Sequence, residues 1–182
     1  MQEFQRDIYQ AALFGAGSSD VAQRRLALDK LSSLACSRDA RAAMLDLHVL
    51  PVLSACLTAK DDVVRASASI CLANLADGDT EVCRRVVNAT SCSIVAPLSN
   101  ILHSLDAKGP AGVGAVCNAC HTIALLAQPP SCRAPLLEQG AMLALAQLLI
   151  RVCDNGSGGG GGGVGGGGGG MLMSTSGTAR VA

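Results

Sequence analysis

Three segments of the chain end in the same pattern of apolar residues, and this internal repeat constrains the fold more than any other feature. The segments span residues 21–35, 63–76 and 113–127, and they close on Leu31-Ser-Ser-Leu34-Ala35, Leu72-Ala-Asn-Leu75-Ala76 and Ile123-Ala-Leu-Leu126-Ala127. The closing alanines are about 40 and about 50 residues apart, close to the period of roughly 40–47 residues in solenoids built from two or three helices per repeat. The second interval therefore contains an insertion.

Each closing pattern ends a segment with helical periodicity. The apolar residues of the middle segment fall every three or four positions, on one helix face: Val64, Ala68, Leu72 and Leu75. Asp61 stands where a helix N-terminus favours an acid, and Gly78 where a left-handed cap is needed. Two shorter helices are predicted after each long one, over residues 38–47 and 50–57, 81–87 and 94–105, and 130–138 and 142–152. We expect a helical repeat domain over residues 1–155 and a Gly-rich disordered tail over 156–182.

The composition narrows the class of protein. Apolar residues make up 49% of the chain and charged residues 15%, which is too apolar for a disordered protein. The charges balance at 14 basic and 14 acidic residues, so no basic excess favours nucleic acid as a partner. Aromatics are almost absent, which suits closely packed helices better than an α/β enzyme core.

The sequence also indicates a compartment. No apolar run is long enough for a membrane span, and the N-terminus does not read as a signal peptide. Nine scattered cysteines, an odd number at irregular spacing, favour reduced thiols. We therefore expect a cytoplasmic protein, with the nucleus as the alternative.

These patterns resemble the armadillo repeat, whose unit is a short helix, a turn often containing glycine, a Leu-rich second helix and a long third helix ending Ala-Leu-x-Asn-Leu-Ala. The best matches are Cys71-Leu72-Ala73-Asn74-Leu75-Ala76 for the ending and Gly140 for the turn. His48 and Ser93 replace that glycine in two other turns, which predicts a different geometry there. The resemblance covers about residues 21–153 and implies an all-α, right-handed superhelix of about three units. The two-helix HEAT repeat is the main structural alternative.

The resemblance also implies a binding surface. In armadillo proteins the asparagine of the third helix grips the backbone of an extended peptide in a concave groove, and Asn74 matches it. The partner-binding residues implied by this register are Asn74, Ile70 and Ser67, their equivalents His121 and Asn118 in the third repeat, and Ser33 in the first. Leu125, Asp29 and Leu26 complete these rows. The competing hypothesis is that Asn74 only caps carbonyls at its own helix end. Because the chain has no tryptophan, recognition of a basic localisation signal is disfavoured.

One motif points to different chemistry. Cys117-Asn-Ala-Cys120-His121 matches the C-x-x-C-H attachment motif of c-type haem, and with Cys132 it offers four zinc ligands. However, the motif lies inside a predicted repeat helix, and the cysteine spacing is not that of a known zinc site. We therefore expect a non-enzymatic protein-binding scaffold without a cofactor. The alternatives are a small haem or metal protein and a structural fragment of a longer repeat protein.

The C-terminal tail has a structural consequence. Residues 156–170 are nearly all glycine, and they follow the second helix of the last unit where its long third helix would begin. Leu145, Leu148 and Leu149 are therefore predicted to lack cover, because a solenoid needs a cap at each end. Such an apolar patch implies a truncated gene product, a partner or self-association.

Overall fold

The computed structural model describes residues 3–89, 92–104 and 109–157, and within these ranges all regular secondary structure is helical. The ten helices are α1 (Glu3–Ala16), α2 (Val21–Leu34), α3 (Arg38–Asp46), α4 (Val49–Leu57), α5 (Asp62–Ala76), α6 (Thr80–Val87), α7 (Val95–His103), α8 (Pro110–Leu126), α9 (Pro130–Glu138) and α10 (Ala141–Ser157). The predicted all-α repeat fold is confirmed.

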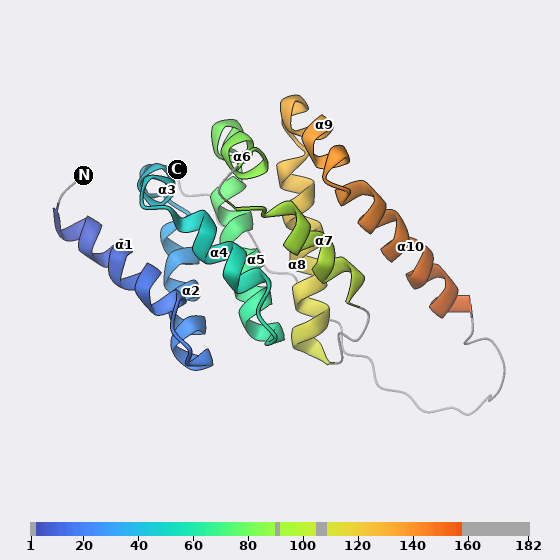
Figure 1. Cartoon of the computed structure of the whole chain (residues 1–182), viewed down its shortest axis with the longest axis horizontal. Coiled ribbons are helices and arrows are strands. Elements are labelled where there is room, and N and C mark those ends of the chain that lie inside the picture. The colour runs from blue at the N-terminus through green and yellow to red at the C-terminus, as the bar shows by residue number, and fades with distance from the viewer. Residues whose placement is uncertain (1–2, 90–91, 105–108, 158–182) are drawn as a thin grey trace, which may run out of the picture.

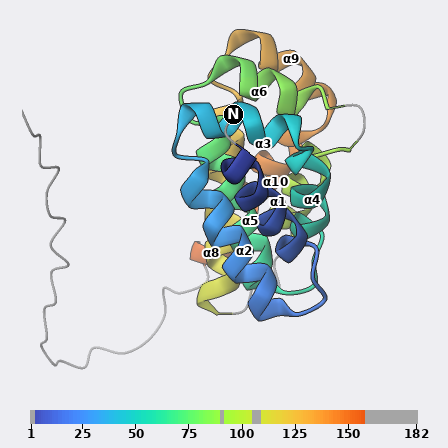
Figure 2. The same ribbon diagram turned by 90° about the vertical axis from the view of Figure 1, so that its left-hand side faces the viewer.

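The helices form three parallel rows (Figures 1 and 2). The long third helices of the units, α2, α5 and α8, pack side by side, and α5 contacts both of its neighbours extensively. The second helices, α1, α4, α7 and α10, form the next row, and the short first helices, α3, α6 and α9, lie along one edge. Two units are complete, α3–α5 and α6–α8, while α1–α2 and α9–α10 are partial units at the two ends.

The core runs continuously between the rows. Its largest side chains with almost no exposed surface are leucines, isoleucines and one methionine: Leu28, Leu31, Met44, Leu53, Leu57, Leu72, Leu75, Ile94, Leu98, Leu102, Ile123 and Leu126. All three closing alanines, Ala35, Ala76 and Ala127, also contact this core. The matched segments thus lie side by side and bury one apolar spine, as the repeat predicts.

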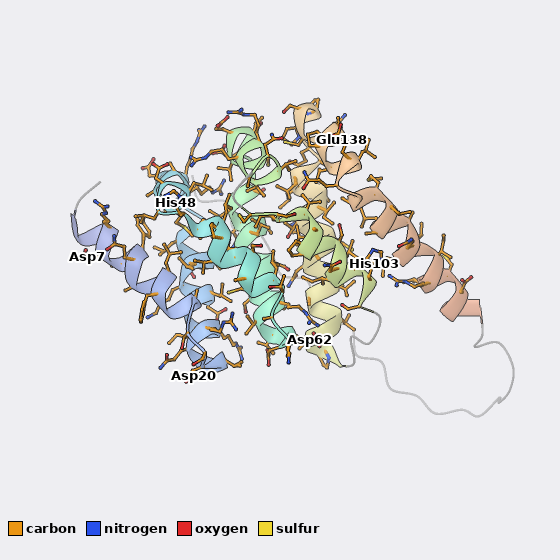
Figure 3. The ribbon with its side chains drawn as sticks, in the orientation of Figure 1. Asp7, Asp20, His48, Asp62, His103 and Glu138 are labelled. Atoms are coloured by element: carbon orange, nitrogen blue, oxygen red, sulfur yellow. The ribbon has the colours of Figure 1, made fainter. Side chains whose placement is uncertain are left out.

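Carboxylates cap the N-termini of α2 and α5. The side chain of Asp20 accepts a hydrogen bond from the Ala22 backbone N–H at 2.8 Å, and Asp61 Oδ1 accepts from the N–H groups of Val63 and Val64 at 2.9 and 3.1 Å. The helix α8 begins after Gly109 without a side-chain cap. Asp20 and Asp62 lie at the same edge of the molecule (Figure 3), because α2 and α5 run in the same direction. Gly78 has a φ of 66°, the left-handed conformation predicted after α5.

The turns between first and second helices differ as the sequence suggests. Gly140 has a φ of 79°, and His48, which stands in its place, adopts a φ of 59° although it carries a side chain. His48 therefore reproduces the glycine turn (Figure 3). Ser93 is not in the left-handed region, and its turn enters α7 through Ile94 at a φ of −102°.

The sequence did not predict α1. This helix takes the position of a second helix, packs against α2 and α4, and buries Tyr9, Ala12 and Ala16. At the other end, α10 continues through Gly156 and Ser157, two residues past the predicted domain boundary. The predicted tail beyond Ser157 lies outside the described residues.

The predicted apolar patch at the C-terminal end is present, with one correction. Leu149 is 64% exposed, but Leu145 and Leu148 are half-buried, because α7 packs against α10 on their side. The other large apolar side chains exposed on α9 and α10 are Leu137, Met142, Leu143, Ile150 and Val152.

Within the described ranges, none of the helices has by itself both the length and the hydropathy to cross a membrane. Two bent helix pairs, α3 with α4 and α9 with α10, reach that length and composition jointly.

Candidate protein-binding surface

The residues that the resemblance singled out fall on the row formed by α2, α5 and α8. We call the solvent-facing side of these helices the third-helix surface, and its central row consists of Asp29, Ile70 and His121 in equivalent repeat positions. All three are exposed, and Ile70 presents 42% of its surface to solvent. The structure thus brings one residue from each third helix to a common, solvent-accessible row.

Asn74 links two third helices. Its side-chain Nδ2 donates to the backbone oxygen of Ser32 at 3.2 Å and to the Ser32 hydroxyl oxygen at 2.9 Å. The amide therefore bonds to the neighbouring helix α2 and not to carbonyls of its own helix end. Among the described residues, none donates a hydrogen bond to its Oδ1 atom, so an acceptor is left on the half-exposed side chain.

The neighbouring predicted residues are also partly committed to helix packing. Ser67 is buried and donates to Asp29 Oδ1 at 3.4 Å, while Asn118 Nδ2 donates to the Ala66 backbone oxygen at 3.4 Å. Ser33 is exposed, but its hydroxyl donates to the Asp29 backbone oxygen of its own helix at 2.9 Å. Of the six predicted binding residues, Ile70 and His121 are the two whose exposed side chains have no hydrogen bond within the described part of the chain.

Two depressions of this surface lie on either side of Leu26. One depression of about 370 Å³ separates α1 from α2 and is lined by Ile8, Leu26 and Leu34 with Asp29, Lys30 and Ser33. A second, of about 720 Å³, lies between the N-terminal halves of α2 and α5 and includes Val21, Leu26, Asp29 and Val63. Leu26 is 58% exposed between them.

Sequence reasoning missed Ile8 and Val63. Ile8 was missed because α1 was not predicted as a helix. Val63 was missed because the predicted binding residues of α5 began at Ser67 and did not include the first turn of the helix. An apolar residue at the start of α5, directly after the Asp61 cap, was the available signal.

Another depression, with a volume of about 770 Å³, lies between the first helices α3 and α6. Charged side chains line this depression, and two ion pairs cross it, Arg85 with Asp46 at 3.4 Å and Arg38 with Asp79 at 4.0 Å. Within α6, the hydrogen bond from Arg84 lowers the pKa of Glu81. Because these charges neutralise one another between adjacent units, this surface is better explained by contacts between repeats than by a ligand.

The C-x-x-C-H motif does not form a cluster. It lies in the middle of α8, where Cys117 and His121 are exposed, whereas Cys120 turns toward the core and is half-buried. Burial raises the pKa of the Cys120 thiol, which disfavours the thiolate that a metal ligand requires. Cys132 is fully buried, and within the described residues no group of three or more His, Cys, Asp or Glu side chains is placed to share a metal ion.

The other cysteines behave as small core residues. The described chain has no disulfide, and the buried thiols include Cys56, Cys71 and Cys83. Burial raises the pKa of each of them, that of Cys83 to about 11. These thiols are therefore protonated at neutral pH.

No protein-family model and no curated protein matches the sequence. Solved structures do match the fold. An engineered protein is similar with a TM-score of 0.68 and 23% identity over 79% of this chain, and a second engineered protein with 0.66 and 26% over 78%. A structure of computationally designed armadillo repeat proteins for modular peptide recognition has a TM-score of 0.63 and 25% identity over 79%.

The chain spans 54–56% of the length of these three proteins. Its complete units contain three helices each, which is the armadillo arrangement and not the two-helix HEAT alternative. By its fold, the chain is therefore an armadillo-like helical repeat protein.

Proposed function

We propose that the protein is a non-enzymatic scaffold that binds an extended segment of a partner protein along the third-helix surface. The observation that carries this proposal is the exposure of Leu26 and Ile70, at 58% and 42%, among groups that can form hydrogen bonds. Neither side chain is used by the core. Exposed apolar side chains rimmed by polar groups are typical of a protein-interaction surface.

The polar groups of the surface suit a peptide backbone. An extended peptide presents N–H and C=O groups on both sides, and the Oδ1 atom of Asn74 is an acceptor for one of these N–H groups. His121 adds a donor or acceptor one repeat further along. Asp29 and Lys30 offer both signs of charge near Leu26, and the exposed Arg25–Asp29 pair, with its atoms 3.9 Å apart, holds its partners only weakly.

The similarity to designed proteins named for modular peptide recognition supports the same proposal. The apolar residues at Leu26 and Ile70 favour a segment with two apolar side chains rather than a basic one. We further propose that the protein acts in a reducing compartment, the cytoplasm or nucleus, which the free thiols support.

The test uses peptides selected from a random display library against the wild-type protein. Their affinities are measured by fluorescence anisotropy for the wild type, Leu26→Asp and Ile70→Asp. We expect each variant to weaken binding at least about tenfold, because a charge would replace an apolar contact in a desolvated interface. Phe14→Asp is the matched control, since Phe14 is also an exposed apolar residue, at 87%, but lies on α1 outside the proposed surface.

Circular dichroism checks that the variants stay folded, which is expected because both substituted side chains already contact solvent. If library selection yields no binders, or if Leu26→Asp and Ile70→Asp bind as tightly as the wild type, the proposed surface is wrong.

A further inference from the structure

The second helices of the units contain a leucine that is buried in every unit except the last. It is the ninth residue after the turn position occupied by His48, Ser93 and Gly140. In the two complete units this residue is Leu57, 1% exposed, and Leu102, 0% exposed. In the last unit it is Leu149, which is 64% exposed. In the complete units the second helix packs against a third helix, α4 against α5 and α7 against α8, and the described part of the last unit has no such helix.

The third helices also differ in exposure, since the outer side of α5 is covered by α8 whereas the outer side of α8 is exposed. On α5, the row that faces α8 contains Ala66, Ser69 and Ala73, of which Ser69 is 0% and Ala73 5% exposed. The equivalent row on α8 contains Cys117, Cys120 and Ala124, and here Cys117 and Ala124 are exposed while Cys120 is half-exposed. The small side chains let α5 and α8 approach closely, and α8 keeps small side chains on its own outer row.

Side-chain hydrogen bonds reinforce the packing of successive third helices. The Thr122 hydroxyl lies 3.0 Å from the Ser69 backbone oxygen of α5 and 2.7 Å from the Asn118 backbone oxygen of its own helix, and it can donate to either. Asn118 Nδ2 donates to the Ala66 backbone oxygen at 3.4 Å. Cys117 and Cys120 occupy the positions on α8 that Ala66 and Ser69 occupy on α5. A further helix with two polar donors four residues apart would match them, as Asn118 and Thr122 match α5.

The uncovered surface is neutral. The first ten residues of α10, Ala141–Ile150, include no charged side chain. The guanidinium of the next residue, Arg151, donates to the backbone oxygens of two residues of α7, Leu102 at 2.6 Å and His103 at 3.2 Å. A polypeptide that binds this surface therefore needs an apolar face, and charged side chains would add nothing to its affinity.

End-to-end stacking of two copies does not supply the missing helix. If α2 of a second copy took the third-helix position beside α8 and α10, its α1 would need the second-helix position that α10 already occupies. Both ends of the described chain carry a second helix, as Figure 1 shows, so they are not complementary. A single helix fits the position, and a second armadillo end does not.

We propose that α8 and α10 form an acceptor site for one amphipathic helix of a partner polypeptide, which completes the last unit as its third helix. The partner helix carries leucine or isoleucine toward Leu145 and Leu149 and small residues with Asn, Ser or Thr toward α8. The site is distinct from the third-helix surface of α2 and α5, and it continues the contact that already joins α5 to α8.

The chain itself supplies a probe with this chemistry, a fluorescein-labelled peptide with the sequence of residues 110–127, which contains α8 with its Asn118 and Thr122. Anisotropy titrations under reducing conditions are expected to give a micromolar Kd with the full-length protein. Leu149→Asp and Ala124→Arg should each weaken binding at least about tenfold, which corresponds to about 1.4 kcal/mol. Phe14→Asp and Ala55→Arg are the matched controls, because both positions are exposed and lie outside both proposed binding surfaces, and they should leave the Kd unchanged.

A second readout needs no substitution. The bound peptide should protect Cys117 from alkylation, measured by mass spectrometry, while Cys36, which is exposed at the end of α2, remains as reactive as before. A peptide of the same composition in scrambled order should protect neither thiol.

The proposal is overturned if the peptide does not bind, or if Leu149→Asp and Ala124→Arg bind it as the wild type does. It is also overturned if sedimentation shows a dimer that Leu149→Asp dissociates and the peptide does not displace, since a second copy is then the occupant. Binding to neutral lipid vesicles that Leu149→Asp abolishes, without peptide binding, would assign the surface to a membrane. The peptide-display test with Leu26→Asp is independent of all these results.

Discussion

The unit formed by α3, α4 and α5 and the pair formed by α9 and α10 share a turn register but expose different residues. His48 and Gly140 make the same left-handed turn before α4 and α10. The leucine nine residues after this turn is nevertheless buried in α4 (Leu57) and exposed in α10 (Leu149). Burial in this fold is therefore decided by the next helix in the stack and not by the apolar pattern of a helix alone, as expected when each repeat contacts only its neighbours.

The largest effect should separate the two leucines of this comparison. Leu57→Ala should lower the free energy of unfolding by about 2–5 kcal/mol, because it leaves a cavity under α5. Leu149→Ala should change it by less than about 0.5 kcal/mol, because solvent already contacts the side chain. Urea denaturation at low protein concentration measures both. Equal losses would mean that Leu149 is covered in solution.

The turns of the same two units give the next effect. Gly140→Ala should cost about 1–2 kcal/mol of unfolding free energy, because an L-residue resists the left-handed conformation and nothing else contacts the added Cβ. His48→Gly should stabilise the protein by less than about 1 kcal/mol, since the relief of strain is partly offset by the flexibility of glycine when unfolded. Thermal denaturation of both variants tests the comparison, and a destabilising His48→Gly would show that the histidine side chain supports its turn.

A smaller effect tests the contact between complete units. Thr122→Val removes the buried hydroxyl that reaches both the Ser69 backbone oxygen of α5 and the Asn118 backbone oxygen of α8, and should cost about 0.5–1.5 kcal/mol. Thr58→Val is the control, because the Thr58 hydroxyl is exposed and bonds only to carbonyls of α4. If both variants lose the same stability by chemical denaturation, the bond between the helices contributes nothing.

The last effect is absent at neutral pH and develops only in alkaline solution. Cys83 lies between the complete units and donates to the Ala76 backbone oxygen at 3.3 Å, and burial raises its pKa from 9.0 to about 11. A raised thiol pKa means that the folded state keeps a proton that the unfolded chain releases, so stability is full below pH 9 and declines as the pH rises toward 11. Cys83→Ala should flatten this decline in denaturation curves, and Cys153→Ala on exposed α10 should not.

The sequence was sufficient for the repeat and its periodicity. The closing Leu-x-x-Leu-Ala patterns located α2, α5 and α8, and the prolines and the Gly140 turn located the shorter helices. It was not sufficient for α1, which buries one tyrosine and two alanines and has no closing pattern. A helix that contacts the stack through small side chains leaves a weak periodic signal.

The candidate site was less predictable than the fold. The register correctly placed Ile70 and His121 on an exposed face, because period alone determines which side of a helix a residue takes. The partner of Asn74 could not be read from its helix, since Ser32 lies on another unit. The same applies to Cys120, whose half-burial depends on how α8 meets the rest of the stack.

Tyr9 has a practical consequence for studying this protein. It is the only tyrosine, the chain has no tryptophan, and it is 5% exposed where α1 meets the stack. Its emission therefore reports on the first unit alone, whereas circular dichroism averages over every helix. If the two signals give different melting curves, the stack of helices unfolds from one end. Because the chain has no tryptophan, a tryptophan in a bound partner segment can be observed without background emission from the protein.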